Sequence, residues 1–241
     1  MDEEILKGKT LLVVDDEVDL RDIVASELEF MGAKVFQAEN IHVAQKILEK
    51  QQIDLVVSDI RMPGGTGIDL LDYIKAKDVN YPPIILITGF ADITVEKAFN
   101  KGAEALMNKP FKLDDLIKTV VKYISPTLER LKSTTAETTK NIEQDMHDEE
   151  CDFGRGGISL RFNTEGKKFE VGETLRFDLK YKTQQLKGTG ICRWYKGPDQ
   201  VLHKASMGLE FVELTGPTFD RFQKVWEEKK IIPFIPSLEA H

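Results

Sequence analysis

Three carboxylates stand directly after two short apolar runs of the sequence. Asp15 and Asp16 follow the run 10–14, and Asp59 follows the run 53–58. Parallel strands bring their carboxyl ends to one edge of a sheet, so we expect the three side chains to meet there. Close carboxylates repel one another unless a cation offsets their charge, and an oxygen-only ligand set suits a hard ion such as Mg²⁺. The spacing therefore predicts a magnesium site.

Two more side chains extend this predicted site. Thr88 ends the apolar run 84–88 with a hydroxyl, and Lys109 supplies an ammonium just before Pro110. A metal ion, a hydroxyl and an ammonium around one carboxylate can hold the oxygens of a phosphoryl group, and the carboxylate can then be the nucleophile. Taken singly, each residue has an ordinary structural explanation, such as helix capping or a solvated lysine. Their combination in this order favours phosphoryl chemistry.

These residues need a parallel sheet flanked by helices to bring them together. Branched apolar runs typical of strands buried on both faces cover 10–14, 53–58 and 84–88, and weaker strands are expected at 34–38 and 104–108. Helical patterns lie between them, at 18–31, 41–50, 67–77, 92–101 and 113–124. The alternation predicts an α/β doubly wound, five-stranded parallel domain.

Four motifs carry a family resemblance over this part of the chain. They are LLVVDDE at 11–17, SDIRMPGGTG at 58–67, LITG at 86–89 and NKPF at 108–111. With them, residues 8–124 resemble the receiver domain of two-component response regulators. The resemblance implies a sensor histidine kinase or phosphotransfer protein as partner, and no enzyme activity beyond autophosphorylation and autodephosphorylation.

The resemblance also assigns roles to single residues. It implies that Asp59 is the phosphoacceptor and that Asp16, Asp59 and the backbone carbonyl of Arg61 bind Mg²⁺, with Asp15 helping through a water. It further implies that Thr88 and Lys109 contact the phosphoryl oxygens.

One position departs from the family pattern. Many receivers carry an aromatic residue three positions before the lysine, and here that position holds Leu106. A leucine has no ring to rotate, so the usual aromatic switch is absent or replaced. Phe90 and Phe99 are candidate substitutes, although packing is the more common role for such residues.

Charge divides the chain into three segments. The net charge is −8, from 33 basic and 41 acidic residues. Residues 1–125 carry 15 basic against 22 acidic residues, 126–150 carry 3 against 7, and 151–241 carry 15 against 12. We therefore expect a receiver domain at 1–125, an acidic linker at 126–150 and a second domain at 151–241. Ser125 and Pro126 are typical of a helix start, so we expect this linker to be helical. A dimerising coiled coil and a disordered tether are the alternatives.

The charge and the apolar pattern also exclude some classes of function. An excess of +3 in the last segment, without a helix-turn-helix pattern, predicts no DNA partner. No apolar run approaches the roughly 20 residues of a membrane span, and the polar first residues do not resemble a signal peptide, so we expect a cytoplasmic protein without membrane insertion.

Alternating hydrophobicity appears from residue 156 onward. The runs are 158–163, 168–171, 174–182, 186–196 and 204–214, and a helical pattern follows at 217–230. They predict an antiparallel barrel or sandwich with a C-terminal helix. The apolar tail 229–241 either packs back on this domain or docks into a partner.

Four motifs also give this second domain a family resemblance. DFGRGGISL at 152–160, VGETLRFDLKY at 171–181, GICRWY at 190–195 and MGLEFVEL at 207–214 resemble the PilZ domain, over about 150–230. The resemblance implies an antiparallel six-stranded barrel, and many members bind cyclic di-GMP. Its D-x-S-x-x-G motif here retains Asp152 and Gly157 but has Gly154 for serine, and the preceding R-x-x-x-R is missing. The missing arginines count against direct binding; Asp152, Gly154, Arg155 and Gly157 are the candidate ligand residues.

The leading hypothesis is a response regulator phosphorylated on Asp59 that signals through the PilZ-like domain by binding an unknown output protein. The alternative is a cyclic di-GMP effector that integrates the second messenger with phosphorylation. A homodimer through the receiver or the linker helix is a further alternative, and the second domain shows no acid, base and nucleophile set that would make it an enzyme.

Overall fold

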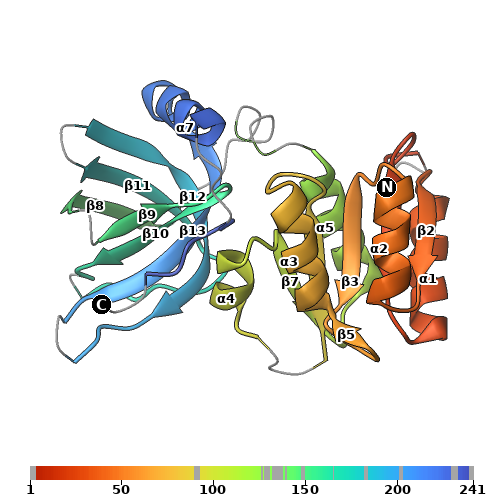
Figure 1. The fold of residues 1–241 in the computed structure, drawn as a ribbon. Coiled ribbons are helices and arrows are strands. Elements are labelled where there is room, and N and C mark those ends of the chain that lie inside the picture. The colour runs from red at the N-terminus through yellow and green to blue at the C-terminus, as the bar shows by residue number, and fades with distance from the viewer. Residues whose placement is uncertain are drawn as a thin grey trace. The chain divides into compact units, whose positions relative to one another are not determined.

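The structure is a computed structural model of the chain (Figure 1). It describes residues 4–89, 93–125, 127, 131, 138, 140–147, 150–164, 166–181, 184–200, 203–228 and 233–238, without the side chains of 225–228. Two compact units make up the chain. The first is Met1–Thr94 with Lys101–Ser125, and the second is Val95–Asn100 with Pro126–His241.

A five-stranded parallel sheet forms the centre of the first unit. Its strands are β1 (Thr10–Val14), β2 (Lys34–Ala38), β3 (Leu55–Asp59), β6 (Ile84–Thr88) and β7 (Ala105–Asn108), in the order β2-β1-β3-β6-β7. The three central strands are apolar on both faces, and most of their side chains are buried. The predicted parallel α/β architecture is confirmed for this unit, with β3 and β7 starting one or two residues later than expected.

Helices cover both faces of this sheet, as Figure 1 shows. Helix α1 (Val18–Phe30) packs beside α5 (Leu113–Ile124), and α2 (Ile41–Lys50) packs beside α3 (Gly67–Lys77). A two-stranded hairpin, β4 (Arg61–Met62) and β5 (Gly65–Thr66), joins β3 to α3. This arrangement turns the carboxyl ends of β1, β3 and β6 toward one edge of the sheet.

A six-stranded mixed sheet forms the second unit. The strands are β8 (Lys140–Met146), β9 (Cys151–Phe153), β10 (Gly157–Phe162), β11 (Thr174–Tyr181), β12 (Gln184–Lys196) and β13 (Ala205–Leu214), in the order β8-β11-β12-β13-β10-β9. The sheet curls around a core that includes Leu160, Phe177 and Leu209 (Figure 1). Helix α7 (Gly216–Glu228) follows, and its Phe222 ring lies 5.1 Å from that of Phe211.

The prediction of a purely antiparallel sheet is wrong at one strand. β8 pairs with β11 in parallel, with Ile142 beside Phe177, whereas the other pairs are antiparallel. Residues 140–146 were expected to belong to a helical linker. Instead they extend beside β11 and bury Ile142 and Met146 in the core, four residues apart on one face of the strand. Most of the remaining linker lies outside the described residues.

Helix α4 (Val95–Asn100) belongs to the second unit, although it stands between β6 and β7 in the chain. It packs against β12. Residues 90–92, which include the candidate switch residue Phe90, lie outside the described residues. Within the described part of the chain, no helix is both long and apolar enough to cross a membrane.

A buried ion pair fastens α3 to the edge of the parallel sheet. The Lys75 ammonium lies 3.0 Å from Glu104 Oε1, and both side chains are almost fully buried. Glu104 Oε2 also accepts the backbone N–H of Ile84 at 2.7 Å, at the start of β6. Sequence reasoning missed this pair because its two residues are far apart in the chain and neither belongs to a motif.

Lys75→Met is expected to destabilise the first unit by about 3–5 kcal/mol, because it leaves the Glu104 carboxylate buried without its partner. Lys101→Met is the matched control: it removes an exposed pair with Asp72 and should cost less than about 1 kcal/mol. Urea unfolding followed by circular dichroism measures both changes. Equal midpoints for the two variants would contradict this account.

Candidate functional site

Two buried carboxylates meet at the carboxyl edge of the parallel sheet. Asp15 directly follows β1, Asp59 is the last residue of β3, and both are buried. A third carboxylate, from Glu17 at the start of α1, joins them from the surface. Oxygens of all three lie within 4.8 Å of one another. An oxygen-only cluster of this kind suits a hard divalent cation such as Mg²⁺.

Lys109 connects the three carboxylates. Its ammonium donates to Asp59 Oδ2 at 2.9 Å, to Glu17 Oε1 at 3.0 Å and to Asp15 Oδ2 at 3.1 Å. The lysine reaches this position because its backbone N–H donates to the carbonyl of Thr88 at 2.6 Å, which fixes it beside the end of β6. In this cluster of described residues one ammonium faces three carboxylates, so negative charge remains for a further cation.

The pKa of Asp15 reflects its buried position beside charged neighbours. Burial raises the pKa of Asp15 above its usual value, and the nearby Asp59 carboxylate adds to the effect; the N–H of Glu17 and the Lys109 ammonium oppose it. Burial alone would lower the pKa of Lys109. Hydrogen bonds to Asp59, Glu17 and Asp15 more than offset burial and raise that pKa above its usual value. Lys109 therefore stays protonated and holds the cluster together.

The residues on either side of the β4–β5 hairpin contact Asp59. The backbone N–H of Ile60 donates to Asp59 Oδ1 at 2.8 Å. Gly67 then passes so close that a Cβ there would lie 2.2 Å from the carbonyl oxygen of Asp59. Its own N–H donates to the carbonyl of Ile60, and the preceding Thr66 caps α3. The glycine at the end of the motif SDIRMPGGTG is thus required by close approach to the backbone.

The structure brings some of the predicted site residues together and places others apart. Asp15, Asp59 and Lys109 are in mutual contact, and Thr88 is buried at the end of β6, paired with Asn108. The Asp16 side chain is exposed and lies outside the three-carboxylate cluster.

The other two predicted site residues lie on the strands β4 and β7. Arg61 begins β4 directly after Ile60, and Leu106 lies half-buried on β7. Glu17 was missed as a cluster member, although the third acid of the DDE run was a signal for it.

The glycine loop, residues 154–157, contains most of the candidate dinucleotide residues of the second unit. Asp152 stands before it on β9 with an exposed side chain. Arg155 is almost fully buried, and its guanidinium lies 5.8 Å from the centre of the Phe234 ring. The C-terminal segment covers the loop: a Cβ at Gly154 would lie 2.4 Å from the carbonyl oxygen of Phe234. For the described part of the tail, residues 233–238, the expectation that it packs back on this domain is confirmed.

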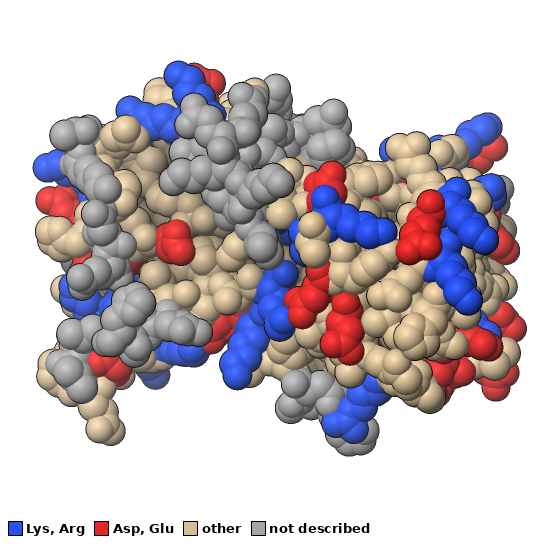
Figure 2. All heavy atoms as spheres, in the orientation of Figure 1, with Lys and Arg blue, Asp and Glu red and all other residues tan. Residues whose placement is uncertain are grey.

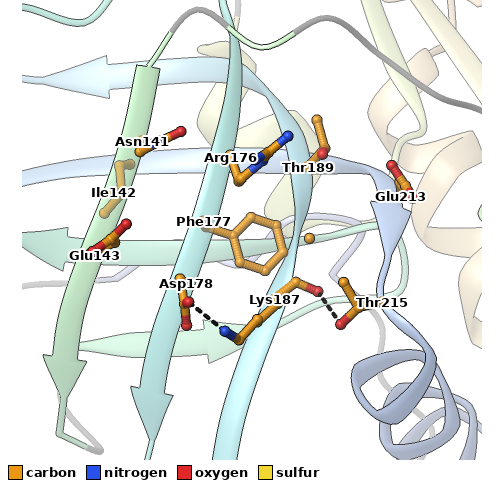
Figure 3. A pocket seen from close by; sticks show the side chains of 11 residues that line it. Asn141, Ile142, Glu143, Arg176, Phe177, Asp178, Lys187, Thr189, Glu213 and Thr215 are labelled. Atoms are coloured by element: carbon orange, nitrogen blue, oxygen red, sulfur yellow. Dashed lines mark hydrogen bonds and ion pairs between the residues drawn. The ribbon is translucent and has the colours of Figure 1, made fainter.

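A separate cavity of about 410 Å³ opens on the outer face of the mixed sheet (Figure 3). Paired strands give it two rows of polar side chains, Asn141, Arg176, Thr189 and Glu213 in one, and Glu143, Asp178, Lys187 and Thr215 in the other. Lys187 is occupied by an ion pair with Asp178 at 2.7 Å. Two cations against three carboxylates give this cavity no excess of positive charge for an anionic ligand.

Comparisons with known proteins agree with the first unit. The sequence model described as "Response regulator receiver domain" matches residues 11–121. The phosphate regulon transcriptional regulatory protein PhoB of Pseudomonas aeruginosa is 31% identical over 175 residues, which are 69% of this chain and 69% of that protein. Sporulation initiation phosphotransferase F of Bacillus subtilis is 30% identical over 120 residues, 49% of this chain and 96% of that protein.

Among solved structures, the response regulator protein TrrA from Thermotoga maritima, in complex with Mg²⁺-BeF, has 33% sequence identity and a TM-score of 0.43. The match covers 48% of this chain and 98% of that one. One family accounts for these similarities. It is the family whose sequence model matches residues 11–121, and the similarity to PhoB extends over 69% of this chain. The chain belongs to the response regulator receiver domain family of two-component signalling proteins.

Proposed function

We propose that Asp59 accepts a phosphoryl group from a sensor histidine kinase or a phosphotransfer protein, in the presence of Mg²⁺, and that the C-terminal unit passes the signal on by binding another protein. The observation that carries this proposal is the contact of Lys109 with both Asp15 and Asp59 at the carboxyl edge of the sheet. It puts an ammonium 2.9 Å from the oxygen that would attack phosphorus.

The donor set fits a divalent cation. The carboxylates of Asp15, Glu17 and Asp59 converge, and the resemblance adds Asp16 and the carbonyl of Arg61 as ligands. A bound Mg²⁺ would neutralise charge on the phosphoryl oxygens. In the transfer, an Asp59 carboxylate oxygen forms the new bond to phosphorus while the bond from phosphorus to the donor breaks. Lys109 stabilises the phosphoryl oxygens without moving a proton.

Two features of the described residues support output through protein interaction. Among the described residues on the face drawn in Figure 2, basic side chains are interspersed with acidic ones, whereas a nucleic-acid surface typically gathers basic side chains. The glycine loop is filled by the chain's own Phe234, so a dinucleotide would have to displace it.

Asp59→Asn should abolish phosphorylation, because an amide lacks the nucleophilic carboxylate oxygen. The full-length chain is incubated with a small acyl phosphate donor and Mg²⁺, and its intact mass is recorded. Wild type is expected to gain one phosphoryl group, which chelation of Mg²⁺ prevents. Asp72→Asn is the matched control, an exposed aspartate on α3, and should gain the group as wild type does. An adduct on Asp59→Asn would overturn the proposal.

Lys109→Met should slow the same reaction by about 10²–10³, the usual effect of removing one preorganised donor from a transition state. The rate of adduct formation measures this. Circular dichroism of the variant checks that the unit still folds when the buried carboxylates lose their partner. An unchanged rate in a folded variant would remove Lys109 from the mechanism.

Cyclic di-GMP is not expected to bind the full-length chain with a Kd in the micromolar range or below. The candidate Arg155 is buried against Phe234, and the cavity on the outer face has no net positive charge. Isothermal titration calorimetry tests this. Micromolar binding that Asp152→Ala abolishes would favour the second-messenger function instead.

A further inference from the structure

The C-terminal segment 233–237, here called the latch, contacts helix α4 within the second unit. Phe234 is fully buried, its ring lies 5.9 Å from that of Phe99, and its backbone N–H donates to the carbonyl of Phe99 at 2.8 Å. Phe99 itself is almost fully buried. Aromatic pairs at this separation stabilise a contact beyond the area they bury.

Polar contacts of Ser237 extend this attachment to the end of the latch. Its backbone N–H donates to Asn100 Oδ1 at 2.9 Å, and its hydroxyl donates to Glu96 Oε1 at 2.6 Å. The other oxygen of Glu96 forms an ion pair with Lys196 on β12. The carboxylate of Glu96 thus links α4 to the latch and to the mixed sheet at once.

The other side of the latch is held by the glycine loop. The N–H of Arg155 donates to the carbonyl of Pro233 at 2.8 Å, and the N–H of Gly156 donates to the carbonyl of Phe234 at 2.9 Å. A Cβ at Gly156 would lie 1.9 Å from the Phe234 ring. Gly156 therefore provides the space for Phe234, and the ring lies between the glycine loop and α4.

We propose that the latch couples receiver phosphorylation to the C-terminal unit: closed on α4 in the unphosphorylated chain, it opens when Asp59 is phosphorylated and exposes the glycine loop and the apolar face of α4. The opening of the latch on phosphorylation rests on the proposed function of Asp59. The closed position of the latch does not, because it follows from the contacts of Phe234 and Ser237 described above.

Chain connectivity supplies the physical route. Helix α4 follows β6, whose last residue, Thr88, holds Lys109 through its carbonyl oxygen. A phosphoryl group on Asp59 redirects the Lys109 ammonium that now binds the Asp59 carboxylate. Only residues 89–94 separate Thr88 from α4 in the chain, so in this proposal a shift of Thr88 is passed on to α4. Leu106 provides no ring to report this shift, whereas the Phe99 ring at the end of α4 is in contact with the latch.

Hydrogen–deuterium exchange of the full-length chain tests the latch. Phe234→Ala removes the central side chain of the latch. Gly156→Ala displaces the Phe234 ring while the sequence of the latch stays unchanged. Both are expected to speed amide exchange in α4, residues 95–100, by roughly tenfold or more relative to wild type. Leu238→Ala, just outside the latch, is the matched control and should leave α4 unchanged. Unchanged exchange of α4 in both variants, with folding verified by circular dichroism, would overturn the closed latch.

The coupling is tested by adding Mg²⁺ and an acyl phosphate donor to the same samples, with the adduct followed by intact mass. In wild type, exchange in both α4 and the latch should rise toward the values of Phe234→Ala, and Asp59→Asn should show no rise. An adduct on wild type without any rise would overturn the coupling. Absence of an adduct would overturn the proposed function and with it the coupling, but not the closed latch.

Discussion

The mutual repulsion of buried carboxylates at one sheet edge is the constraint on which the receiver site depends. Parallel pairing places Asp15 and Asp59 together, and burial of both in a low-dielectric setting is unfavourable without a cation. Lys109 supplies a fixed positive charge, the N–H of Ile60 donates to the Asp59 carboxylate, and Gly67 lies close to the Asp59 backbone carbonyl. The remaining negative charge is what makes the pocket receptive to a divalent cation and, in our proposal, to a phosphoryl group.

In the second unit, the main constraint is the close approach of the C-terminal segment to the backbone of the glycine loop. The glycine loop resembles a ligand motif, yet its lack of side chains accommodates Phe234 of the same chain. The side chain of Arg155, which could have met a phosphate, is buried beneath that segment. A surface that would otherwise be open to a ligand is thus covered by the C-terminal segment. This supports an output in which uncovering a protein surface is the signal.

The sequence was sufficient to predict the site residues that stand at the ends of parallel strands. It was not sufficient for features that depend on pairing between residues far apart in the chain. Asp15, Asp59 and Lys109 were predicted to meet because parallel strands end at one edge, and they do. In the sequence, the spacing of Ile142 from the apolar residues before it fits a helix. Residues 140–146 nevertheless form a strand, because they pair with the edge of β11. The Lys75 to Glu104 pair and the contact of Phe99 with Phe234 join residues distant in sequence, so no local pattern could indicate them.

The central claim is that one carboxylate, Asp59, carries the signal. Sodium borohydride reduces an aspartyl phosphate to homoserine, and tandem mass spectrometry of the digested chain then reads the position of that homoserine. The account predicts homoserine at residue 59 alone after incubation with an acyl phosphate donor and Mg²⁺. Homoserine at another aspartate, or a phosphoryl group on a side chain that borohydride leaves intact, would contradict it.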